Sequence, residues 1–332
     1  YFLALSGVAG TGRGGHMERA VQRGRQVFAD HAHGAMVVAF AAVALLAEVL
    51  MRGGPVDRHI PVTLIRVSLA RSAALVLLAA LFIPLEMAFA GRKKRVFRTG
   101  WRADVVYFFV NNFFAAGGTL IMVAVLGLGL RALLPGALHD AIVRQPGGLQ
   151  FAEAFLLSEI AEYWAHRTMH AVPWLWRFHK VHHGITEMDW LASARLHPVD
   201  RAFTRSSAFL PLFVLGFSTV TIGAFTVFAA VQALAVHANV RFTFGPFRYV
   251  LATPQYHHWH HDAAAATNKN FAAKLPVVDW MFGSLHMPRG LWPSRYGIDE
   301  QSPETYFGQL AWPFAAATPA VVGLATDEAQ AA

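Results

Sequence analysis

The chain contains His166-Arg-Thr-Met-His170, followed closely by His179-Lys-Val-His182-His183, and a third histidine-rich stretch far downstream, His257-His258-Trp-His260-His261. Residues three and four positions apart lie on the same face of an α-helix. We therefore expect each stretch to direct two or three imidazoles towards one point. The spacing predicts eight metal ligands and leaves His237 as a ninth candidate: His166, His170, His179, His182, His183, His257, His260, His261 and His237.

Eight or nine imidazoles exceed the four ligands of one tetrahedral zinc ion and suit two metal ions with open positions. No packing requirement calls for so many paired imidazoles, which would repel one another once protonated near neutral pH. A low-complexity metal-buffering tract does not fit, because the clusters are spaced apart among Trp, Phe and Leu residues. His258 is out of step with its helical face and His286 has no partner, so neither is expected to bind metal.

Two carboxylates precede the first histidine pair on the same predicted helical face. Glu159 and Glu162 would be costly against lipid, so they should face protein. Glu162 lies one turn from His166 and is expected to orient its ring, as outer partners of metal-bound histidines do. Pairing of Glu162 with Arg167 or Arg177 is the alternative.

The composition indicates a membrane protein. Hydrophobic residues make up 55% of the chain and charged residues only 14%, with a mean hydropathy of +0.39, whereas a soluble domain is about a quarter charged. The chain has no cysteine, which excludes disulfides and thiolate metal sites. A formal charge of +8 is compatible with nucleic-acid binding, but the basic residues lie beside apolar segments. We therefore expect a membrane and no nucleic-acid partner.

The apolar segments predict about four transmembrane helices: 35–51, 72–90, 105–130, and a helix from about 149 to 170 that Pro173 ends. The apolar stretch 208–236 is too long for one crossing and short for two, which favours a re-entrant or short hairpin.

The basic run 91–102 is the densest in the chain, and as a short loop between spans it marks the cytoplasmic side. With a cytoplasmic N-terminus, four crossings put 131–148 outside and the first two histidine clusters inside. The hairpin then returns the third cluster to the same side. The predicted fold class is therefore all-α and integral to the membrane, with a cytoplasmic His-rich helical cap.

The three histidine stretches, in this order, resemble those of the fatty acid hydroxylase superfamily, the sterol desaturase type of integral-membrane oxygenase. That family carries HxxxH, HxxHH and a final HxxHH. The resemblance runs from about Pro84 to Gly283. Five surrounding elements are also similar to the family: Glu162-Tyr-Trp-Ala-His166-Arg, Arg195-Leu-His197-Pro198, His237-Ala-Asn239, Asn270-Phe271 and Asp279-Trp-Met-Phe282-Gly283.

The resemblance implies a non-haem centre of two iron ions that hydroxylates or desaturates a lipid, such as a fatty acyl chain, a sterol or a carotenoid. Dioxygen would be the oxidant, and a separate donor, a ferredoxin or a b-type cytochrome, would supply electrons. The family elements add His197, Asn239 and Asn270 to Glu159 and Glu162 as residues expected to support the ligands. On this basis residues 1–33 form a cytoplasmic extension, 34–288 the membrane-embedded oxygenase domain and 289–332 a C-terminal tail.

Two other functions stay open. Imidazole binds zinc as well as iron, so a zinc-dependent membrane lipid hydrolase is the main alternative. A His-rich metal transport or binding protein is less favoured, because a transporter would place ionisable residues deep within several spans. In this chain they gather at the ends of the predicted spans.

Overall fold

The structure is a computed structural model that describes residues 60–242, 244–264 and 268–315. The predicted extension 1–33, the predicted span 35–51 and the end of the tail lie outside the described residues. The chain divides into two units, Tyr1–Leu64 and Ile65–Ala332, and the description below concerns the second.

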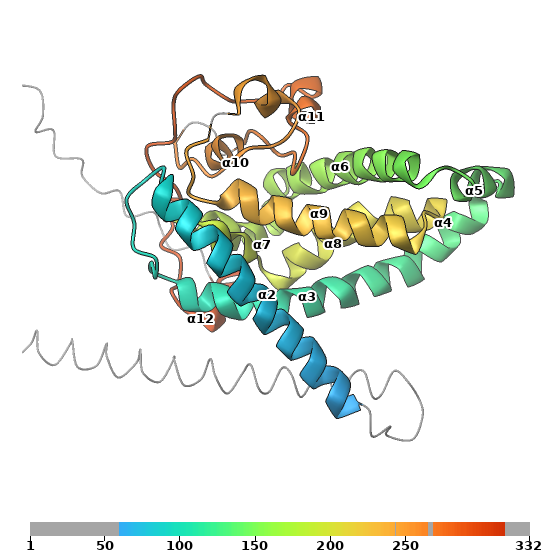
Figure 1. Ribbon diagram of the computed structural model, residues 1–332, viewed down its shortest axis with the longest axis horizontal. Helices are drawn as coiled ribbons and strands as arrows, with labels where there is room; N and C mark the ends of the chain where they lie inside the picture. Colours follow the sequence, from blue (N-terminus) through green and yellow to red (C-terminus); the bar gives the residue numbers. More distant parts are fainter. Residues whose placement is uncertain (1–59, 243, 265–267, 316–332) are drawn as a thin grey trace, which may run out of the picture. The chain divides into compact units, whose positions relative to one another are not determined.

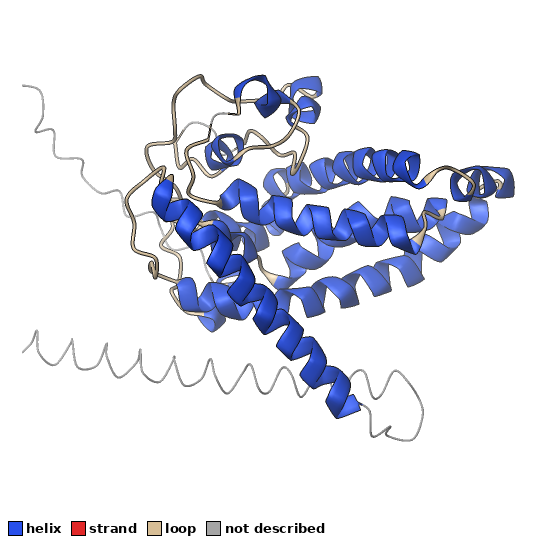
Figure 2. Ribbon diagram, viewed as in Figure 1, coloured by secondary structure: helices blue, strands red, loops and turns tan. Residues whose placement is uncertain are grey.

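Figure 2 shows that the regular structure of the described residues is helical, as the predicted all-α class requires. Two isolated antiparallel bridges, Ala90 with Val240 and Asp262 with Tyr296, are the exceptions in this part of the chain. The longer helices are α2 (Ile60–Ala88), α3 (Trp101–Met122), α6 (Gly147–Ala171), α8 (Pro198–Leu215) and α9 (Thr219–His237). The shorter ones are α4 (Leu128–Leu133), which a π-helical turn Val123–Gly127 joins to α3, then α5 (Gly136–Val143), α7 (Pro173–His183), α10 (Pro254–His260), α11 (Pro276–Met281) and α12 (Tyr306–Ala311).

Three helical segments of the described chain are long and apolar enough to cross a membrane: Arg71–Ala88, Trp101–Leu133 and Thr219–His237. The first two correspond to the predicted spans 72–90 and 105–130. The predicted helix 149–170 forms as α6 and ends before Pro173, but it is not one of the three. Its buried face carries polar side chains, among them Ser158 and Glu159, so its mean hydropathy is too low.

The predicted hairpin 208–236 is also corrected. It begins earlier, at Pro198, and consists of two long helices, α8 and α9, of which α9 alone could cross a membrane. Gly216 ends α8 with a φ of +82°, a left-handed conformation that favours glycine. The Ser218 side chain then accepts a hydrogen bond from the Thr221 N–H and caps α9. Charged residues in the first turns of α8 hid its start from a search for apolar segments.

The helices pack so that their histidine-bearing ends meet. Helix α8 packs against both α3 and α6, α9 packs against α6, and α10 packs on α9. Figure 1 shows α7 and α10 at the same end of this bundle, with α5 at the other. Because α6 and α9 both run towards α7 and α10, the chain turns bring distant histidines together.

Buried ion pairs attach the basic run 91–102 to this end. Arg98 donates to Asp104 at 2.6 Å and to Asp189 at 2.7 Å, and Arg195 donates to Asp104 at 2.6 Å. All four side chains are almost fully buried. Removing one member would leave another charge unpaired in the interior, which costs about 3–5 kcal/mol. The loop that follows α2 is thereby fixed against the segment that follows α7.

Candidate metal centre

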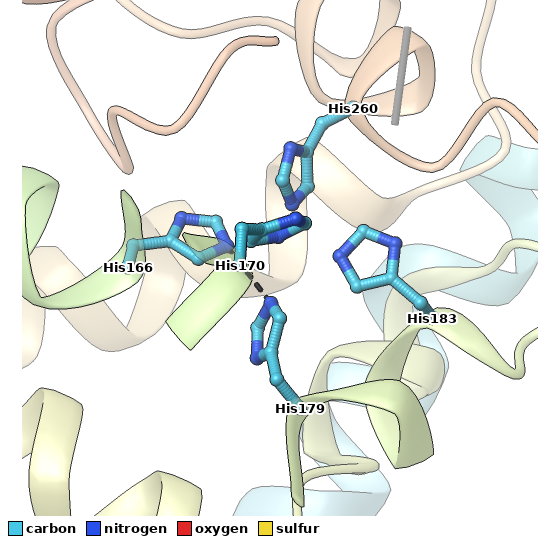
Figure 3. A group of neighbouring side chains, drawn as sticks. All are labelled: His166, His170, His179, His183 and His260. Carbon is cyan, nitrogen blue, oxygen red and sulfur yellow. Dashed lines mark hydrogen bonds between the residues drawn. The ribbon is translucent and has the colours of Figure 1, made fainter. Parts of the chain in front are cut away.

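All nine candidate histidines come together, in two sets. The five-histidine set contains His166, His170, His179, His183 and His260, and the four-histidine set contains His182, His237, His257 and His261. Within each set the candidate ligand nitrogens lie within 4.8 Å of one another. Figure 3 shows the five rings of the first set pointing towards a common centre.

Helical spacing decides which histidine joins which set. On α7, His179 and His183 are four residues apart and share the five-histidine set, whereas His182 points into the other. The third stretch does the reverse, because His257 lies in the four-histidine set and His260 in the five-histidine set. Positions three and four residues along a helix diverge by about 100°. The expectation that each HxxHH stretch aims at a single point is therefore wrong, since each contributes to both sets.

The ring nitrogens that face away from the sets are held by acceptors at their periphery. These contacts run from His166 Nδ1 to the Phe271 carbonyl (2.7 Å), His260 Nδ1 to the Lys269 carbonyl (2.7 Å), His182 Nδ1 to the Arg195 carbonyl (3.0 Å), His237 Nδ1 to the Ala233 carbonyl (2.7 Å) and His179 Nδ1 to an Asp200 carboxylate oxygen (2.8 Å). When Nδ1 donates to a carbonyl, it carries the ring proton. Nε2 is then unprotonated and has a free lone pair. This is how proteins orient metal-binding histidines.

The inward nitrogens lie too close together for neutral imidazoles without a cation. His166 Nε2 is 3.0 Å from His179 Nε2. In the other set, His237 Nε2 is 3.3 Å from His182 Nε2 and 3.0 Å from His257 Nε2. With the protons on Nδ1, the contacts of His166 with His179 and of His182 with His237 oppose lone pair to lone pair. A metal ion between the nitrogens would turn each repulsion into a bond.

Unsatisfied buried nitrogens point to the same conclusion. The Nε2 atoms of His170, His183 and His260 have no hydrogen-bond partner, and all three are buried. A buried polar atom left without a partner costs about 1–3 kcal/mol. The residues therefore fit two metal ions, one in each set.

Burial keeps the imidazoles in the form that binds metal. It lowers the pKa of His182, His183, His257 and His261 well below the ordinary value, and neighbouring imidazoles lower it further. These side chains are therefore neutral at pH 7, as a ligand must be.

The two expected carboxylates both pair with a lysine. Lys274 pairs with Glu159 at 2.9 Å and also with Glu162, and Glu159 accepts the backbone N–H of Lys274. The expected bond from Glu162 to His166 is not formed, because His166 Nδ1 faces the carbonyl of Phe271. Glu162 forms its ion pair with Lys274, and not with Arg167 or Arg177 as the alternative had it.

The other three expected supports do not hydrogen-bond to a clustered imidazole through their side chains. His197 caps α8 by accepting the Val199 N–H at 3.2 Å. Asn239 accepts the Arg92 N–H at 3.0 Å and anchors the basic loop beside α9. Asn270, with a φ of 58°, donates to the carbonyls of Tyr256 and His286. These residues position segments that carry ligands or their outer partners.

Sequence reasoning missed the direct outer partners. Most are backbone carbonyls, which carry no side-chain signal. Asp200 is the exception, since it lies in the first turn of α8, just after the Arg195-Leu-His197-Pro198 element. Its acidic side chain close to that element was the available signal.

The two histidines that were not expected to bind metal, His258 and His286, lie outside both sets, as predicted. His258 Nδ1 is 2.7 Å from the Tyr296 hydroxyl, and its Nε2 is 3.3 Å from the carbonyl of His237. His286 does have a neighbour, because its ring contacts Trp259 with centroids 5.0 Å apart. Neither histidine faces the clustered nitrogens.

Residues 151–284, which include all nine clustered histidines, match the family model for fatty acid hydroxylase. This segment of the chain is similar to the fatty acid hydroxylase superfamily. The predicted resemblance is therefore confirmed, and the matched domain runs from α6 to just beyond α11.

The fatty acid hydroxylase domain is similar to curated proteins with different names. Ornithine lipid hydroxylase OlsE of Rhizobium tropici is 32% identical over 51% of this chain and 51% of its own length. Very-long-chain aldehyde decarbonylase GL1-11 of Oryza sativa subsp. indica is 26% identical over 47% and 58%. Methylsterol monooxygenase 2-2 of Arabidopsis thaliana is 23% identical over 39% and 50%. The chain thus spans about half the length of these curated relatives. No solved structure matches it.

The ninth candidate ligand, His237, can be tested by metal analysis of the purified protein. His237→Ala removes one of four ligands from one set and leaves the other set intact. We expect metal content to fall from about two ions per chain to about one. The control His286→Ala should retain both ions. Full occupancy in His237→Ala, or equal loss in His286→Ala, would show that His237 is not a ligand.

The pKa directions predict how stability depends on pH. The unfolded chain binds protons at its histidines as pH falls below about 6.5, whereas the buried imidazoles of the folded chain stay neutral. Metal-free protein should therefore keep its stability above pH 6.5 and lose about 1.4 kcal/mol per pH unit below it for each such histidine. Denaturant titrations from pH 8 to pH 5 measure this. A metal-free chain that is more stable at pH 5 than at pH 7 would contradict the neutral assignment.

Proposed function

We propose that the chain is a membrane-bound diiron oxygenase, which uses dioxygen and external electrons to hydroxylate or desaturate a lipid. The observation that carries this proposal is a pair of adjacent, all-imidazole metal sets beside an apolar cavity. Imidazole is a good ligand for iron, and the chain has no cysteine that would favour a thiolate site. Iron bound there would supply the dioxygen activation that side chains cannot perform.

A ligand in the cavity would lie beside both sets. It has a volume of about 360 Å³, within the range of ligand pockets. Histidines from both sets line it: His166, His179, His182, His237 and His257. Apolar side chains from four helices form much of the remaining wall: Leu78, Phe108, Phe209, Phe225 and Leu234. Because α2, α3 and α9 are the apolar helices, a lipid dissolved in the membrane can reach the histidines without crossing water.

The residues of the chain have distinct tasks in this proposal. The clustered imidazoles hold the ions, and the peripheral carbonyls with Asp200 fix the orientation of the rings. The apolar wall excludes water and holds a C–H bond of the lipid next to the ions. Electrons come from a separate donor, a ferredoxin or a b-type cytochrome. The similarity to a hydroxylase and to a monooxygenase favours oxygenation over zinc-dependent hydrolysis.

Lipid mass spectrometry of cells with and without the chain tests the function. We expect a lipid that gains one oxygen atom, for hydroxylation, or loses two hydrogen atoms, for desaturation. The product should require dioxygen and should disappear in His182→Ala, whereas His286→Ala should still form it. The purified protein should contain iron. A zinc-loaded chain that releases a cleaved lipid without dioxygen would establish the hydrolase instead.

We also propose that the metal centre faces the cytoplasm. The basic run 91–102 touches the segment after α9, since Asn239 bonds to Arg92, and short basic loops favour the cytoplasmic side. The chain lacks cysteine, so single cysteines can report sidedness. Arg95→Cys and Ala264→Cys, both at exposed positions, should be labelled from the cytoplasm. Ala137→Cys, in the exposed segment around α5, should be labelled from the opposite side. Labelling of Arg95→Cys and Ala264→Cys from different sides would refute the shared location.

A further inference from the structure

One wall of the cavity carries charges that the metal chemistry does not use. This wall is a face of α8, and its residues recur at helical spacing: Asp200, Arg201, Thr204, Arg205, Ala208 and Phe209. Asp200 is engaged by His179 Nδ1 at the metal end. With a rise of about 1.5 Å per residue, Arg201 and Arg205 follow within about two turns of Asp200. Two arginines therefore face the cavity close to the histidines.

Neither arginine makes an ion pair with a described residue. The Nε atom of Arg201 is buried and has no hydrogen-bond partner. The guanidinium carbon of Arg205 lies 4.4 Å from the centroid of the Phe209 ring. The third cation of the cavity, Lys274, differs because it contacts both Glu159 and Glu162 directly. Glu162 and Asp200 lie near enough to attract Arg201, and Glu162 also attracts Arg205, but the direct contacts of these carboxylates are with Lys274 and His179.

The pKa values of the three cations agree with these contacts. Burial lowers the pKa of Arg201. Burial and then the neighbouring Arg201 lower the pKa of Arg205 to about 10. Lys274 shows the opposite, because the attraction of Glu159 and Glu162 outweighs burial and raises its pKa. Both arginines remain charged at neutral pH, in a place where an anion would offset the cost of their burial.

We propose that the cavity binds an anionic amphiphile whose oxyanion, a carboxylate or a phosphate, lies on Arg201 and Arg205. Its apolar chain lies along the apolar part of the lining, to which α9 contributes Phe225, Ala229 and Leu234. The planar guanidinium suits an oxyanion because two N–H groups can donate to two oxygens at once. This inference rests on the proposed function only in taking the cavity as the substrate site, since the preference for an anion can be measured without turnover.

Binding of matched ligands to the metal-loaded protein tests the proposal. The dissociation constants of oleate, oleyl alcohol and oleoyl lysophosphatidate are measured in a non-ionic detergent without dioxygen. These probes share one apolar chain and differ in the head group. We expect at least one of the two anions to bind about tenfold or more tightly than the alcohol, as one charge-assisted hydrogen bond provides. Preference for oleate or for the lysophosphatidate identifies the carboxylate or the phosphate.

Substitutions assign that preference to the two arginines. Arg201→Gln with Arg205→Gln should abolish the difference between anion and alcohol while binding of the alcohol persists. Arg205→Lys keeps the positive charge and should retain most of the preference for the anion. The matched control Arg144→Gln changes an arginine that is 77% exposed and should behave as the wild type. If the double variant loses metal, and with it the fold, the single Arg205→Gln variant replaces it in the test. We then expect a partial loss of the preference for the anion.

Equal affinity of the wild type for all three ligands would overturn the proposal, and so would an unchanged preference in the arginine variants. The two proposals fail separately. If the arginines select anions but the wild type forms no oxidised lipid, the oxygenase function fails and the anion site stands. If the wild type oxidises a lipid but shows no anion preference, the anion site fails and the oxygenase function stands.

Discussion

Nine imidazoles gathered inside a protein crowd their inward nitrogens together, and the lone pairs on those nitrogens must meet something positive. This constraint governs the structure. Peripheral acceptors, such as the carbonyl of Phe271 for His166 and Asp200 for His179, hold the outward protons. The inward nitrogens then oppose one another at about hydrogen-bond distance, as between His237 and His257 at 3.0 Å. A cation in each set would resolve this arrangement, because it would accept the inward lone pairs as ligands.

The architecture serves that constraint. Helices α6 and α9 run towards the same end of the bundle, where α7 and α10 supply histidines to both sets. The polar supports hold backbone in place more than they hold rings. Glu159 accepts the Lys274 N–H, which steadies the segment after Phe271, and His197 caps the helix that carries Asp200. The same helix then continues as the wall that bears Arg201 and Arg205, so the ion sites and the ligand cavity share one element.

Spacing along the chain was enough to predict that nine histidines gather at one end of the bundle, and that the described residues are all-α. It could not predict how the histidines divide, because the division of each HxxHH stretch depends on which side of α7 and α10 each neighbour occupies. The partners of His166, His182 and His260 were also beyond prediction, since any residue offers a carbonyl. Helix α8 was misplaced because Asp200, Arg201 and Arg205 interrupt its hydropathy. Those same charges line the cavity, so the local failure of the hydropathy pattern marked the charged part of the cavity wall.

Iron-edge anomalous diffraction from crystals of the iron-loaded protein tests the central claim most directly, because it locates the ions without reference to activity. We predict two peaks, one enclosed by the five-histidine set and one by the four-histidine set. A single peak, or a peak away from the clustered imidazoles, would contradict the two-ion centre.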